Sequence, residues 1–103
     1  MRVTVIRPDN LVLVDGRAET VDCSQVRAEV RVVQWNSDKS LGHIEFDNAE
    51  ANAWSARGNE EIKDFSEFTP LLKVWEEVAR KADAKLAEVR RQLEEEAKAM
   101  PQL

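Results

Sequence analysis

The sequence predicts an α+β protein in which a small antiparallel sheet of about five strands, a meander plus a hairpin, packs with one long C-terminal α-helix. Two observations carry this prediction. Short β-branched runs separated by turn residues fill the first half of the chain. About thirty residues rich in Ala, Glu, Lys, Arg and Leu, without Gly or Pro, then precede Pro101. The length of 103 residues favours one domain.

The meander is predicted from the first 21 residues. Residues 3–6 and 11–14 are β runs, and residues 7–10, Arg-Pro-Asp-Asn, have turn chemistry. Asp15-Gly16 supplies the positive φ angles of a type I′ turn, so residues 17–21 are expected to return as a third strand.

The hairpin is predicted from residues 30–35 and 43–46, which flank a polar segment. In the later strand Ile44 and Phe46 share one face, whereas His43 and Glu45 share the other. One face of the sheet should therefore be buried against another element, and the other face should be exposed to solvent.

Residues 47–59 lack a clear period and are expected to form a surface loop. We expect Trp54 in this loop to fold back over the edge of the core, because large aromatic side chains normally bury most of their area. The spacing of three between Ile62, Phe65 and Phe68 predicts a helical turn or two beneath the same core.

The long helix is predicted to start at Thr69-Pro70, with Thr69 as the N-cap and Pro70 at the first helical position, and to stop at Pro101. Its apolar positions repeat with spacings of four, three and four, an eleven-residue repeat that corresponds to about 3.67 residues per turn. The apolar face is wide at first and narrows beyond Ala82. We therefore predict a β module with the start of the helix over residues 1–82 and a distal interaction segment over residues 83–103.

The distal half of the helix has three possible arrangements: docked on its own domain, paired with another chain, or frayed as a charged tail. Pairing is favoured, because propensity alone stabilises an isolated helix little and the apolar positions would otherwise stay in water. The predicted partner-binding residues are Leu86, Val89, Leu93, Ala97 and Met100.

The sequence holds few residues of the types that act as catalytic groups or metal ligands. Cys23 is the only cysteine and is expected to be buried, and His43 is the only histidine and is expected to face solvent. No constellation of nucleophile, base and ligand is evident, so we expect no enzyme activity, no metal and no cofactor.

Residues 1–70 carry 8 Lys/Arg against 13 Asp/Glu, which disfavours nucleic acid as a partner. No apolar run is long enough for a signal sequence or a membrane span, which predicts a cytoplasmic protein.

The sequence resembles small tailed-bacteriophage and prophage proteins of the tail-fibre region. The resemblance covers roughly residues 1–79 and rests on the segments Val32-Val33-Gln34-Trp35, Gly42-His43-Ile44-Glu45-Phe46 and Phe68-Thr69-Pro70, with the opening Met1 to Ile6. Some of those proteins are similar to the front domain of tail-fibre assembly chaperones. The charged helix after Ala79 and the longer loop near Trp54 depart from the pattern.

The resemblance implies a structural or assembly role in a phage tail region, with no catalytic residues to carry over. The expected partner is a second copy of the chain or a phage tail or tail-fibre protein, in the host bacterial cytoplasm or carried in the virion. The alternative function is an acidic host-directed regulator or adaptor, because acidic residues exceed basic ones in residues 1–70.

Overall fold

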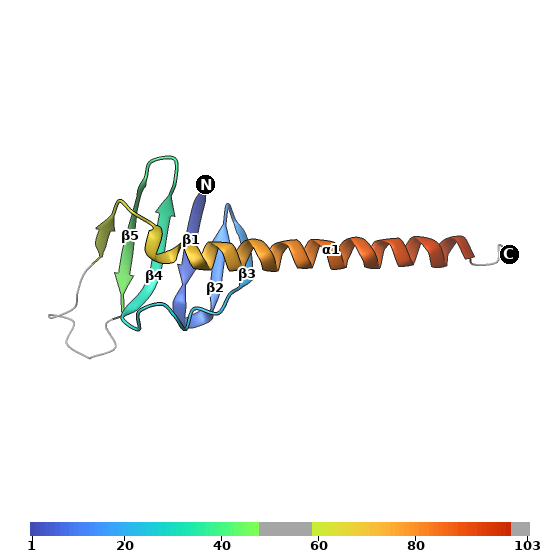
Figure 1. Cartoon of the computed structure of the whole chain (residues 1–103), viewed down its shortest axis with the longest axis horizontal. Coiled ribbons are helices and arrows are strands. Elements are labelled where there is room, and N and C mark those ends of the chain that lie inside the picture. Colours follow the sequence, from blue (N-terminus) through green and yellow to red (C-terminus); the bar gives the residue numbers. More distant parts are fainter. Residues whose placement is uncertain (48–58, 100–103) are drawn as a thin grey trace.

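A six-stranded antiparallel sheet carries one long helix across one face, and the helix runs on past the edge of the sheet (Figure 1). The computed structural model describes residues 1–47 and 59–99. The predicted α+β class is confirmed, with one strand more than the predicted five or so. The elements are β1 (Arg2–Ile6), the 3₁₀ turn η1 (Arg7–Asp9), β2 (Leu11–Val14), β3 (Arg17–Thr20), β4 (Val30–Asn36), β5 (Leu41–Phe46), β6 (Glu60–Ile62), the 3₁₀ turn η2 (Ser66–Phe68) and α1 (Thr69–Ala99).

The strand order is β3-β2-β1-β4-β5-β6, so β1 lies between β2 and β4. The meander and the hairpin predicted from the sequence therefore join into one sheet through the antiparallel pair of β1 and β4. The turn between β2 and β3 has φ angles of 48° at Asp15 and 86° at Gly16, which confirms the positive φ angles predicted for this dipeptide.

The core lies between one face of the sheet and the helix. Val5 sits opposite Val12 on one side and Val33 on the other, and all three are fully buried. The cover comes from the η2 segment and the first turns of α1, where Phe65, Phe68 and Leu71 complete the buried cluster, with Phe68 only 1% exposed. These buried side chains hold α1 on the sheet, because apolar burial is the main favourable term in folding.

Two aromatic contacts join the sheet to the start of the helix. The rings of Trp35 in β4 and Phe65 stack with centroids 5.4 Å apart, and Phe65 contacts Phe68 at 5.6 Å. Trp35 lies over Gly42 of β5, whose missing side chain leaves room for the indole. The entry of the chain into α1 is thus fixed by packing.

The two faces of the sheet differ as predicted. Ile44 and Phe46 are each 2% exposed on the covered face, whereas His43 and Glu45 are only partly buried on the other. Cys23 is buried and free, also as predicted.

Two predictions about the segment before the helix are wrong. Ile62 belongs to the short edge strand β6, so the expected helical turns reduce to η2 alone. Thr69 does not cap the helix: its backbone is already helical, and its hydroxyl donates a hydrogen bond to the Phe65 carbonyl over 3.2 Å. The preceding turn is held instead by Asp64, which accepts a hydrogen bond from the Ser66 amide at 2.9 Å.

Some sequence predictions lie outside the described residues. These are the loop around Trp54, together with Met100 and Pro101 at the end of the chain.

Candidate functional site

The candidate site is the part of α1 that extends beyond the sheet. The molecule measures 72 × 32 × 21 Å and its radius of gyration is 19.5 Å, whereas a compact chain of this size has a radius of about 13 Å. Figure 1 shows the cause, since the distal half of α1 continues past β3 with no other element beside it. All side chains from Lys81 to Ala99 are exposed.

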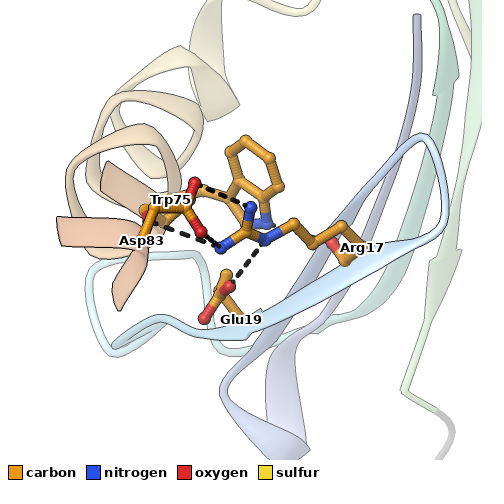
Figure 2. Close-up of polar contacts among 5 residues, drawn as sticks. Arg17, Glu19, Trp75 and Asp83 are labelled. Carbon is orange, nitrogen blue, oxygen red and sulfur yellow. Dashed lines mark hydrogen bonds and ion pairs between the residues drawn. The ribbon is translucent and has the colours of Figure 1, made fainter. Parts of the chain in front are cut away.

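Arg17, at the start of the edge strand β3, holds α1 where it leaves the sheet (Figure 2). Its guanidinium donates two hydrogen bonds to the carboxylate of Asp83, at 3.0 and 3.2 Å, and one to the Ala79 carbonyl at 3.3 Å. A further hydrogen bond of 2.9 Å goes to Glu19 in the same strand. This paired geometry suits Arg and carboxylate, because two parallel N–H donors match two oxygens.

Trp75 completes this clamp from the helix side. Its indole N–H donates to the Arg17 carbonyl at 3.1 Å, and the Arg17 guanidinium lies 5.9 Å from the indole ring. We call Arg17, Glu19, Trp75, Ala79 and Asp83 the clamp. Asp83 is the last clamp residue along α1, and beyond it the helix no longer contacts β3.

The clamp predicts a pH dependence of helix docking. The hydrogen bonds from Arg17 hold the pKa of Asp83 below its ordinary value of 3.8. A carboxyl whose pKa is lowered by folding stabilises the fold above that ordinary value, and the contribution is lost as pH falls through the lowered pKa. We expect the indole environment of Trp75 to change in acid, with a midpoint below pH 3.8.

Tryptophan fluorescence between pH 6 and about pH 2 measures this transition as the part of the acid change that depends on Asp83, since Trp35 and Trp54 also emit. The Asp83→Asn variant is the control, because it keeps one acceptor oxygen but cannot titrate. An acid transition that is unchanged in Asp83→Asn would show that Asp83 does not carry it.

Beyond the clamp, α1 presents a narrow apolar stripe. Leu86 is 50% exposed, Val89 42% and Leu93 59%, and Ala97 is exposed on the same side. We call these four residues the seam; Met100, the fifth predicted partner-binding residue, lies outside the described residues. At about 100° per residue the seam continues the face of the helix that carries Trp75 on the sheet. Docking of the distal half on its own domain, one of the three predicted arrangements, is therefore not what the structure shows.

The charges on the distal helix fall into two groups. On the side away from the seam, Arg91 forms ion pairs with Glu88 at 2.5 Å and Glu95 at 2.6 Å. Closer to the sheet, Arg80 pairs with Glu77, three residues before it. The residues that flank the seam are exposed and form no ion pair within the described part of the chain: Lys85, Arg90, Glu94 and Glu96.

The uncovered face of the sheet has a shallow hollow of about 510 Å³, with Thr4, His43 and Glu61 in its lining. Within residues 1–47 and 59–99 no hydrogen bond or ion pair joins these three side chains. The hollow therefore holds no assembled pair of nucleophile and base, the unit that nucleophilic catalysis requires.

Two other kinds of site are absent from the described residues. No cluster of three or more His, Cys, Asp or Glu side chains is placed to hold a metal ion. No described helix combines the length and the apolar character needed to span a membrane.

Comparison with known proteins gives no match: no protein family, no curated protein and no solved structure is detectably similar to the chain. The resemblance to tail-region proteins therefore stays a prediction. So do the absence of enzyme activity and the division of the chain after residue 82.

Sequence reasoning identified the seam residues but missed the clamp. Arg17 follows an Asp-Gly turn, where an exposed charged residue is unremarkable, and its partner Asp83 lies 66 residues later. No local pattern signals such a contact.

Proposed function

We propose that this protein is an assembly or structural protein of a phage or prophage tail region and acts by protein–protein interaction through the seam of α1. The observation that carries the proposal is the exposure of Leu86, Val89 and Leu93 on a helix that projects clear of its own sheet. We place the protein in the host bacterial cytoplasm during assembly, or in the virion afterwards.

Two physical arguments support an interaction role. A helical segment without tertiary contacts gains little stability from propensity alone, so a projecting helix becomes well ordered when a partner covers its apolar side. Burial of a leucine side chain contributes about 1.5–3 kcal/mol, and the seam offers two leucines and a valine. The sheet and the clamp serve to hold this helix in a fixed direction.

The alternative of an acidic regulator receives less support from the contacts. Several carboxylates of residues 1–70 are neutralised locally, since Arg17 pairs with Glu19, Arg27 with Glu67 and Arg31 with Glu45. The acidic excess of residues 1–70 is thus partly offset within the fold, which weakens the case for a nucleic-acid mimic.

The proposal is tested by capture of the tail proteins encoded beside this chain in its phage or prophage. We expect the tagged protein to retain a neighbouring tail or tail-fibre protein when the two are co-expressed. Leu86→Asp with Leu93→Asp should abolish this retention, because two charges replace the largest apolar side chains of the seam.

The matched control is Ala84→Asp with Gln92→Asp, which adds two carboxylates to the same exposed helix outside the seam. Equal capture by the wild type and the seam variant would contradict the proposal. So would equal loss in both double variants, which would point to a general effect of added charge.

A further inference from the structure

We infer that the seam binds a second copy of the same seam in antiparallel orientation, with Arg91 at the level of the two-fold axis. This inference rests on the proposed function and names one partner for the same surface. It is carried by three observations: the order of large and small residues along the seam, the charges on its flanks, and the length of helix that extends past the clamp.

The seam is complementary to itself when reversed. If Val89 of one copy packs against Leu93 of the other, Leu93 meets Val89 by symmetry. Leu86 then comes level with Ala97 of the partner to within one residue, about 1.5 Å along the axis. Each leucine at the end of the seam thus faces an alanine, and pairing of large with small side chains lets facing helices interdigitate.

One flank of the seam is also complementary to itself in this orientation. At about 100° per residue, Lys85 and Glu96 project on one side of the seam, and Arg90 and Glu94 on the other. In an antiparallel pair each flank faces the same flank of the partner. Lys85 then lies within about one residue of the partner's Glu96 along the axis. On the other flank Arg90 lies within about two residues of both the partner's Glu94 and the partner's Arg90, so the first flank carries the charge argument.

These four charged side chains differ from the charged residues that pair within the helix. Arg91 is already paired with Glu88 and Glu95 on the outer side. The four flanking side chains are exposed and unpaired among the described residues, so their charges are available to a partner. A parallel pair would bring opposite flanks together at equal heights and place Glu94 beside the partner's Glu96, where like charges repel.

The length of the projecting helix fits the same arrangement. Arg91 lies midway between Asp83, where the clamp ends, and Ala99, the last described helical residue. An antiparallel partner centred on Arg91 would therefore cover the described part of α1 beyond the clamp, residues 84–99. Its Ala99 would come level with Asp83 at the edge of β3, and the partner helix would continue the layer that the sheet occupies.

Charge reversal tests the orientation. We expect sedimentation equilibrium of the full chain to give a dimer with micromolar affinity, since the contact is short. Lys85→Glu and Glu96→Lys should each weaken the dimer about tenfold, because each reversal sets like charges against each other at two symmetric positions. The combined Lys85→Glu, Glu96→Lys variant should dimerise within about twofold of the wild type, since the pair is restored with its signs exchanged.

A combined variant whose dimer affinity falls by the product of the two single losses would overturn the antiparallel orientation. A wild type that stays monomeric up to millimolar concentration would overturn it too. The proposed function still holds after either result if the Leu86→Asp, Leu93→Asp variant fails to capture a tail protein that the wild type captures. A dimer that this seam variant leaves intact would overturn the inference by placing the interface elsewhere.

Discussion

Replacement of Gly42 with alanine is expected to lower the free energy of unfolding by about 3 kcal/mol or more. A Cβ at this position would lie 2.1 Å from the Gln34 carbonyl oxygen and 3.0 Å from two atoms of Trp35. Backbone and indole would both have to move. Because small domains are stable by only about 5–15 kcal/mol, the loss is a substantial part of the total.

The consequence extends to the helix. Trp35 stacks on Phe65, and Phe65 contacts Phe68 at the start of α1, so displacement of the indole disturbs the packing that fixes the helix. Chemical denaturation followed by circular dichroism measures the loss. The control is Gly16→Ala, where the new methyl group meets nothing within 4 Å and the cost is the positive φ angle of 86°, about 1–2 kcal/mol. Equal losses for the two variants would contradict the packing argument.

The sequence allowed most of the sheet to be predicted because its signals are local. Asp15 and Gly16 specify their own turn, and the alternation around Ile44 specifies which face is buried. β6 was missed because Glu60 and Glu61 are poor strand formers, and their strand exists only by pairing with β5, a contact between distant segments. The misassigned N-cap at Thr69 has a similar cause, since packing of Phe65 and Phe68 draws the chain into a 3₁₀ turn first.

One part of the candidate site could be predicted from local sequence signals, and another part could not. The narrowing of the apolar stripe beyond Ala82 can be read from residue spacing, so the seam was predictable. Which copy or partner covers it depends on contacts between chains, which no periodicity encodes. The clamp depends on the approach of β3 to α1, so Arg17 and Asp83 could be recognised only once the sheet was assembled.

A second large effect is expected in the hydrogen exchange of the backbone amides of α1. The proximal half is packed on the sheet, with Leu71 and Ala79 buried, so its amides should be strongly protected from hydrogen exchange at every concentration. Residues 84–99 have no tertiary contact within one chain, and their amides should exchange within about tenfold of the unstructured rate in dilute solution. Association through the seam should then protect them.

Hydrogen exchange resolved along α1, measured at low and high protein concentration, therefore tests the central claim that the distal helix pairs with a second copy of itself. We predict that protection of residues 84–99 rises with concentration, that protection near Leu71 does not, and that Leu86→Asp with Leu93→Asp removes the rise. Protection of the distal half that is the same at all concentrations, or unchanged in the seam variant, would contradict the claim.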